Sequence, residues 1–112
     1  MAGLQQAQRD VSTIFGAFAH HRRRYALRGL RMHENPMSVA DLADEVAIRE
    51  NESPVTEIPA EEVKRVSLSL YHTHIPKLAA ANLVQYDRER DSVALTERVE
   101  EIEQYRALLT VE

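Results

Sequence analysis

The stretch that decides the fold is residues 60–95, AEEVKRVSLSLYHTHIPKLAAANLVQYDRERDSVAL. Its first part predicts a long helix, because apolar residues recur there at steps of three and four and so share one helical face: Leu68, Tyr71, Ile75 and Leu78. Another face carries polar residues: Arg65, Ser69, His72 and Thr73. We expect the helix to end near Ala81, because Asn82 tolerates the left-handed backbone with which many helices end. One face is expected to pack against a core and the other to contact a partner.

Two short strand-like runs follow this helix without a linker. They are separated by a charged turn: Leu83, Val84 and Tyr86, then Arg88–Asp91, then Val93 and Leu95. Apolar runs on either side of a short polar turn are typical of a β-hairpin. The sequence therefore predicts a small two-stranded hairpin, which we call the wing.

Two helices are expected earlier in the chain. The first is capped by Asp10 or Ser12 and has a buried apolar stripe: Val11, Ile14, Phe15 and Phe18. The second, His20–Met32, holds five arginines and no acid: Arg22, Arg23, Arg24, Arg28 and Arg31. Two interpretations of these arginines stay open, which are contacts to phosphate or a solvated face that pairs with acidic segments.

A third helix begins at Ser38 with a clear start signal. Ser38 and Asp41 form a pair like a capping box, although the acid is Asp rather than Glu or Gln, and Met37 can contact Leu42 across the cap. Its apolar residues predict a buried stripe: Val39, Leu42, Ala43 and Val46. This helix is expected to support the long helix that follows.

Several segments resemble the winged helix-turn-helix transcription regulators of the arsenical-resistance-repressor type. They are FGAFAHHRRRYALRGL (15–30), SVADLADEV (38–46), HIPKLAAANLVQYD (74–87) and VALTE (93–97). The resemblance covers roughly residues 14–98, and the whole chain is also similar to uncharacterised small winged-helix proteins of halophilic archaea. It implies a mainly helical fold with a small β wing, a winged helix-turn-helix of about five helices and a two-stranded β-hairpin.

The resemblance also implies roles for these elements. In that class the long helix, here residues 60–81, enters the major groove of DNA. The Arg-rich helix lies behind it with its first turn near the DNA backbone, which implies phosphate contacts for Arg22 and Arg23. The first and last helices pair between two subunits, which implies a homodimer with a C-terminal dimerisation helix at residues 97–110.

The chain departs from the resembling class between the third helix and the long helix. Residues 47–58 are longer than a simple turn, and residues 41–62 carry eight acids against Arg49 alone. Acids placed against DNA would repel its phosphates. We therefore expect this insertion to lengthen the third helix, loop outward and add turns to the start of the long helix, so that the middle of the long helix reads DNA.

Pro76 is a second irregularity, because it falls inside the predicted long helix. Proline there removes a backbone hydrogen bond and usually costs about 3 kcal/mol. We expect a kink near His72 or Thr73. Either packing absorbs the strain, or the kink aims the preceding face into a groove.

Composition limits the number of domains and the kinds of site that the chain can form. A chain of 112 residues predicts one domain, residues 10–112, after a flexible tail of residues 1–9. Cysteine is absent, so disulfides and thiolate metal sites are excluded. Acids outnumber bases by 18 to 14, and only Lys64 and Lys77 are lysines. This usage fits a saline cytoplasm, although a net charge of −4 is also ordinary for a small domain.

The sequence gives no sign of catalysis, a cofactor or a membrane. It has no Gly-rich phosphate loop, no Cys nucleophile and no nucleophile elbow, so we expect no catalytic residues. The rings of His72 and His74 would diverge on a helix, so we expect no metal site. His74 is instead expected to pack under the long helix and His72 to be exposed. No run approaches the ~20 apolar residues that span a bilayer, which predicts a cytoplasmic protein.

The predicted function is sequence-selective binding of double-stranded DNA by a homodimer, as a transcriptional regulator. The long helix would contact base edges or nearby phosphates through Ser69, His72 and Thr73, and the backbone through Arg65 and Lys77. The wing would reach the minor groove or phosphates through Arg88 and Arg90. The expected dimer interface consists of apolar residues: Ile14, Phe18, Val99, Ile102, Tyr105 and Leu109.

An alternative is a winged-helix module that binds protein and does not read DNA. The acidic segment 41–62 and the lack of a continuous basic stripe favour it. Target sequence, sign of regulation and any small-molecule or metal effector are not encoded in a recognisable motif.

Overall fold

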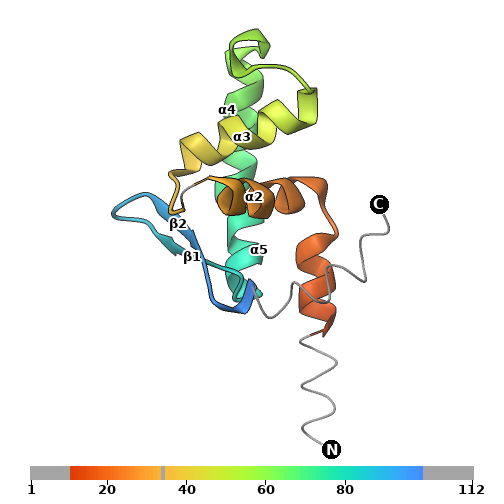
Figure 1. Cartoon of the computed structure of the whole chain (residues 1–112), viewed down its shortest axis with the longest axis vertical. Coiled ribbons are helices and arrows are strands. Elements are labelled where there is room, and N and C mark those ends of the chain that lie inside the picture. The colour runs from red at the N-terminus through yellow and green to blue at the C-terminus, as the bar shows by residue number, and fades with distance from the viewer. Residues whose placement is uncertain (1–10, 34, 100–112) are drawn as a thin grey trace, which may run out of the picture.

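The structure is a computed structural model, and it describes residues 11–33 and 35–99. Within these ranges the protein is mainly helical with one two-stranded antiparallel sheet, which confirms the predicted fold class, a winged helix-turn-helix (Figure 1). Residues 11–18 are helical, and the elements that follow are α2 (His21–Met32), α3 (Val39–Asn51), the 3-10 turn η1 (Val55–Glu57), α4 (Ala60–Ser69), the π-helical turn η2 (Leu70–His74), α5 (Ile75–Ala80), β1 (Val84–Asp87) and β2 (Ser92–Leu95).

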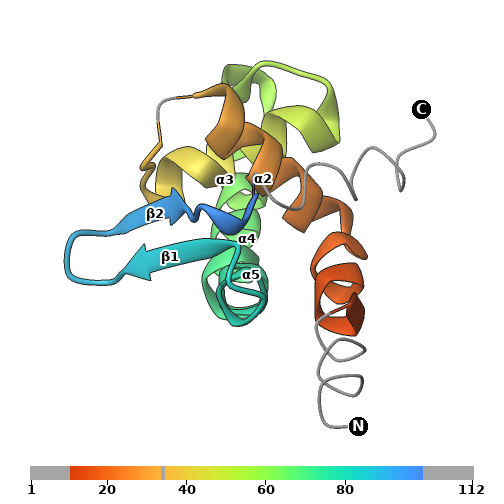
Figure 2. The same cartoon turned by 60° about the horizontal axis from the view of Figure 1, so that its bottom comes forward.

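The long helix runs through α4, η2 and α5 without a break, and we call residues 60–80 the rod. Helices α2 and α3 lie across the rod, α3 against α4 and α2 against η2 (Figures 1 and 2). Asn82 has the left-handed backbone predicted for the end of this helix, with a φ of 60°. Among the described residues, no helix combines the length and the apolar character needed to cross a membrane.

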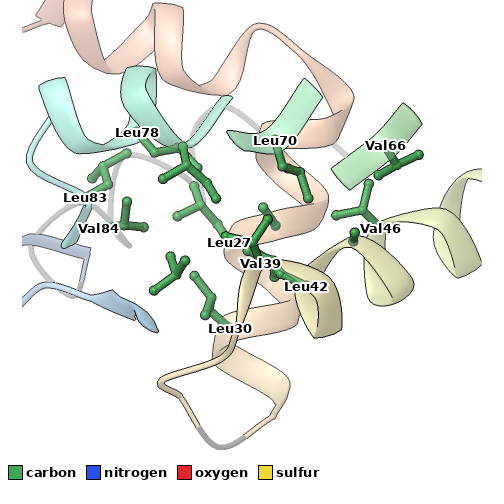
Figure 3. Close-up of a cluster of buried hydrophobic side chains, with 14 of the residues drawn as sticks. Leu27, Leu30, Val39, Leu42, Val46, Val66, Leu70, Leu78, Leu83 and Val84 are labelled. Carbon is green, nitrogen blue, oxygen red and sulfur yellow. The ribbon is translucent and has the colours of Figure 1, made fainter. Parts of the chain in front are cut away.

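The core fills the space between the rod, the two crossing helices and the base of the wing. Figure 3 shows most of the side chains involved: Leu27, Leu30, Val39, Leu42, Val46, Val66, Leu70, Leu78, Leu83 and Val84. The stripe predicted for the third helix is confirmed, because Val39, Leu42, Ala43 and Val46 are all buried. The Ser38 cap is also present, since its hydroxyl accepts a hydrogen bond from the Asp41 N–H at 3.0 Å.

Helical geometry changes in the middle of the rod, where Leu70–His74 form a π-helical turn. The Ile75 N–H donates to the Leu70 carbonyl five residues back. Pro76 has no N–H, and its ring crowds the carbonyl four residues earlier. A wider turn relieves this crowding and leaves the axis continuous. The irregularity expected near His72 and Thr73 is therefore a π-turn, and Figure 1 shows no sharp bend.

The π-turn decides which side of the rod is buried. Four of the buried residues follow a spacing of four, Val66, Leu70, His74 and Leu78, and Ile75 is also buried, as predicted. In a regular α-helix such a line drifts by about 40° at each step, and the wider turn offsets part of this drift. Our prediction for Leu68 was wrong, since 49% of its surface is exposed, and Tyr71 is only half-buried. That prediction assumed one α-helical period throughout.

The acidic insertion has the expected form. It lengthens α3 as far as Asn51, and Glu52 then takes a left-handed backbone with a φ of 51°. The chain passes through η1 and enters α4 after Pro59. Exposed acids gather at this end of the molecule, the top of Figure 1, and we call it the acidic end: Glu52, Glu57 and Glu61.

The wing is fixed to the segment that precedes α3. Its strands pair antiparallel, with Tyr86 opposite Val93. Met37 exchanges two backbone hydrogen bonds with Val93, at 2.9 and 2.8 Å. The Asp91 carboxylate accepts a hydrogen bond from the Val39 N–H at 3.3 Å. The wing is thereby tied to the start of α3 as well as to the rod.

Two leucines on the rod give a matched test of this register. Leu70 is fully buried and Leu68 is half-exposed on the opposite side. Leu70→Ala should lower the free energy of unfolding by about 2 to 5 kcal/mol, because it leaves a cavity. Leu68→Ala should change it by about 0.5 kcal/mol or less. Urea unfolding measures both, and equal losses would contradict the register.

Candidate nucleic-acid interface

The side of the rod that faces away from α2 and α3 carries exposed side chains at a spacing of four. They form a ridge of Lys64, Leu68, His72 and Pro76, flanked by Arg65, Thr73 and Lys77. We call these seven residues the outer face. The π-turn keeps the ridge in line for the same reason that it keeps the buried residues in line. Four residues predicted to contact DNA are therefore exposed together on this face: Arg65, His72, Thr73 and Lys77.

The outer face carries cations at both ends, Lys64 and Arg65 at its start and Lys77 at its end. Residues 63–86 contain no Asp or Glu, whereas acids lie on either side at Glu62 and Asp87. Glu61 and Glu62 fall in the first turn of α4, where negative charge is favourable to the helix dipole. A polyanion would therefore be attracted by the middle and end of the rod and repelled at its start.

Ser69 differs from the other predicted contact residues, because its hydroxyl is already engaged. It accepts a hydrogen bond from Arg22 Nη1 at 2.8 Å. Arg22 also forms an ion pair with Glu50, through Nε to Oε1 and through Nη2 to Oε2 at 3.3 Å. Arg22 therefore joins α2 to α3 through Glu50 and to the rod through Ser69. Arg22 is neutralised by Glu50, so the structure does not support the predicted phosphate contact.

The predicted phosphate contact of Arg23 is wrong, because only 7% of this residue is exposed. Its guanidinium donates to the carbonyls of Ala17 at 3.1 Å and Gly16 at 2.9 Å, and to His74 Nδ1 at 3.1 Å. Carbonyls at the end of a helix lack helical partners. Arg23 donates to two carbonyls at the end of the helix of residues 11–18, of which Gly16 also accepts from the Ala19 N–H, and joins that helix to the rod.

His74 lies on the buried side of the rod, as predicted, with 4% of its surface exposed. Burial, followed by the nearby His20 and Arg23, lowers its pKa from 6.5 to about 4. Because Arg23 can only donate, the His74 Nδ1 must accept, so the ring is neutral with its proton on Nε2. The His20 ring lies 4.4 Å from the His74 ring, and burial followed by the charge of His21 lowers the pKa of His20.

The wing meets the outer face through aromatic contacts. The Arg88 guanidinium lies 5.5 Å from the centre of the Tyr71 ring, a cation–π distance. The Tyr71 ring lies 6.2 Å from Tyr86 and 4.9 Å from His72, edge to face in both cases. Arg88 therefore extends the outer face, and its contact with DNA stays a prediction.

Arg90 lies further out, at the tip of the wing. Its side chain is 85% exposed, and its Nε lies 3.8 Å from an Asp87 carboxylate oxygen. Glu89 and Asp91 are also exposed in this turn. The acids offset part of the positive charge, so Arg90 is a weaker candidate for a phosphate contact than Arg88.

The predicted dimer interface is only partly described. Ile14, Phe18 and Val99 are half-buried against the core. The prediction that Val11 and Phe15 are buried was wrong, because they are 47% and 51% exposed. Ile102, Tyr105 and Leu109, and most of the predicted helix 97–110, lie outside the described residues. Dimerisation stays a prediction.

No group of three or more His, Cys, Asp or Glu side chains is arranged to hold a metal ion in residues 11–33 and 35–99. The histidines near the rod form hydrogen bonds and ring contacts within the protein instead. His21 bonds to Glu50 at 2.9 Å and stacks on His20, with 4.6 Å between ring centres.

The neutral state of His74 predicts a loss of stability in acid. A histidine with a lowered folded pKa stabilises the fold above its unfolded value of 6.5, and this contribution is lost as the pH falls through the folded value of about 4. The loss between pH 7.5 and pH 4 should be about 3 kcal/mol. Urea unfolding across this range measures it.

His74→Gln keeps a hydrogen-bond acceptor for Arg23 but does not titrate, so it should remove that part of the pH dependence. His72→Gln, at an exposed position on the same turn, should keep it. Identical pH profiles for wild type and His74→Gln would contradict the assignment.

Comparison with known protein families gives one match. The model of a family described as a domain of unknown function (DUF7344) matches residues 15–94, which is more than half of the chain and includes α2, α3, the rod and nearly all of the wing. Searches of curated proteins and of solved structures found no match.

Proposed function

We propose that this chain, which belongs to the DUF7344 family, is a sequence-selective double-stranded DNA-binding protein that regulates transcription as a homodimer. The observation that supports this most is the outer face. It combines exposed cations, a hydroxyl and an imidazole on one rigid helix, within a stretch that has no acid.

The spacing of charges on the outer face suits a major groove. Lys64 and Lys77 are thirteen positions apart, or about 20 Å along the helix axis. The major groove is about 12 Å wide, so cations at both ends can contact the phosphates on either side. His72 and Thr73 lie between the lysines and would contact base edges, with Arg65 beside Lys64 on the backbone.

The acidic end would determine how the rod is oriented on DNA. Glu52, Glu57 and Glu61 would lie outside the groove, because they would repel phosphate. DNA would therefore contact the rod from Lys64 onward, and the wing, through Arg88, would contact the adjacent backbone or minor groove. The polar contacts of Arg22 and Arg23 would position the rod from behind.

A second function is favoured by the acidic end itself. Exposed carboxylates gathered on one end can bind a basic protein surface, and a winged-helix module that does not read DNA would use them in this way. This interaction module and the DNA reader predict different responses to substitution, so one set of variants distinguishes them.

The DNA-binding proposal predicts two kinds of response among variants of the outer face. Lys64→Ala and Lys77→Ala should weaken binding to all sequences and reduce the salt slope by about one each, because each removes a phosphate contact. His72→Ala and Thr73→Ala should change the preferred sequence, with losses of about 1 to 3 kcal/mol at a contacted base pair. Arg28→Ala, exposed on α2, is the matched control and should do neither.

The measurement is selection of bound duplexes from random DNA, followed by titration at several salt concentrations. If no sequence is enriched at any salt concentration at which the protein is folded, the regulator is excluded. A co-purifying protein whose capture depends on Glu57 would then favour the interaction module.

Dimerisation predicts a dimer mass by light scattering at tens of micromolar protein, and a selected motif with two-fold symmetry. Phe15 is half-exposed on the helix that carries the predicted interface residues Ile14 and Phe18, so Phe15→Asp should place a charge in the interface and give a monomer that remains folded. Lys64→Ala should remain a dimer. A monomer mass for the wild type would exclude the dimer and leave DNA binding to be judged by selection.

A further inference from the structure

Leu68 is a large apolar side chain in the middle of an otherwise polar and cationic surface. It is 49% exposed, and the core positions nearest to it on the rod are taken by Val66 and Leu70. The other exposed large apolar residues of the described chain lie elsewhere: Val11, Phe15, Met32 and Val55. Leu68 therefore belongs to the outer face and is not a core residue.

Cations lie before and after Leu68 on the outer face. Lys64 and Arg65 lie one turn before it, and Lys77 lies at the far end of the outer face. If these cations contact phosphates on the two sides of a groove, the residues between them lie over the bases. Leu68, His72 and Pro76 are the ridge residues in that interval, and Leu68 and His72 are about 6 Å apart along the axis.

We infer that Leu68 reads the 5-methyl group of a thymine in the major groove. This inference rests on the proposed function and adds a sequence preference to it. The thymine 5-methyl is the one methyl group among the base edges of the major groove, which otherwise present mainly hydrogen-bond donors and acceptors. An aliphatic side chain satisfies the methyl and leaves any donor or acceptor beneath it without a partner.

The residue type at position 68 fits a contact to a methyl group. A lysine or arginine at position 68 would add to the phosphate contacts, whereas leucine adds none. Compared with lysine or arginine, leucine lowers the affinity for DNA in general. It contributes to binding only where a methyl group lies against it, so its effect is on sequence preference.

The test uses the duplex selected from random DNA. Each thymine in the selected site is replaced in turn by deoxyuridine, which removes only the 5-methyl group. At one position per half-site the wild type should bind about fourfold more weakly, the fold-change expected for one buried methyl group. Leu68→Ala should bind the thymine and deoxyuridine duplexes equally, while its salt slope stays that of the wild type.

Two controls separate this contact from a general loss of binding. Met32→Ala, at an exposed apolar position on α2, should keep the fourfold difference. His72→Ala should also keep it, because His72 would contact a different base pair. Since Leu68 is half-exposed, Leu68→Ala should remain folded, and circular dichroism checks this.

The outcomes distinguish this inference from the proposed function. A selected site in which deoxyuridine has no effect, or in which its effect survives Leu68→Ala, overturns the inference and leaves DNA reading in place. A selected site without thymine does the same. If no site is selected at all, the proposed function fails, and the inference fails with it. Loss of the fourfold difference in Leu68→Ala alone supports the contact.

Discussion

Pro76 imposes the constraint on which the arrangement of this protein depends, because it removes a backbone donor from the helix that α2, α3 and β1 pack against. The chain meets this constraint with a π-turn at Leu70–His74. The turn keeps Leu70, His74 and Leu78 pointing into the core and keeps Leu68 and His72 in line outside it. A π-turn carries one extra residue per turn, so the same five residues decide both the core and the surface offered to a partner.

A layer of polar contacts holds the π-turn against α2. Arg23 is buried with every described contact going to a carbonyl or to the neutral His74, so its charge is shared among several acceptors rather than cancelled by one acid. Arg22 differs from Arg23, because its charge is paired with one acid, Glu50. A buried cation that loses a partner is costly, so this layer favours one orientation of α2 on the rod. The arginines of α2 nearest the rod therefore serve the fold, and cations for a polyanion remain on the outer face.

Much of the fold could be predicted from the sequence, because its signals are local. Ser38 marks the start of α3, Asn82 marks the end of the rod, and the alternation after it marks the wing. The register of the rod could not be predicted in the same way. Steps of three and four placed Ile75 and Leu78 correctly but also favoured Leu68 as a buried residue. The structure buries Leu70 instead, at the start of the π-turn, which is a response to Pro76 through backbone geometry.

The candidate site was predictable in part for a related reason. Exposure of Arg65, His72, Thr73 and Lys77 follows from their place opposite the core. The roles of Arg22 and Arg23 did not follow, because a run of like charges says nothing about which carbonyls or acids lie nearby in space. Their partners, Glu50 and Gly16 among them, come from different helices. The lowered pKa of His74 comes first from its burial and then from the charges near it, and neither is visible in the sequence.

The central claim is that the outer face of the rod contacts DNA, and amide NMR shifts during titration with a selected duplex test it most directly. The predicted result is that the largest shifts fall on the outer face and the adjoining wing residue: Lys64, Leu68, His72, Lys77 and Arg88. Arg24 and Arg28 on α2 and Glu57 at the acidic end should stay unchanged. Largest shifts on α2 or at the acidic end, with the outer face unaffected, would contradict the claim.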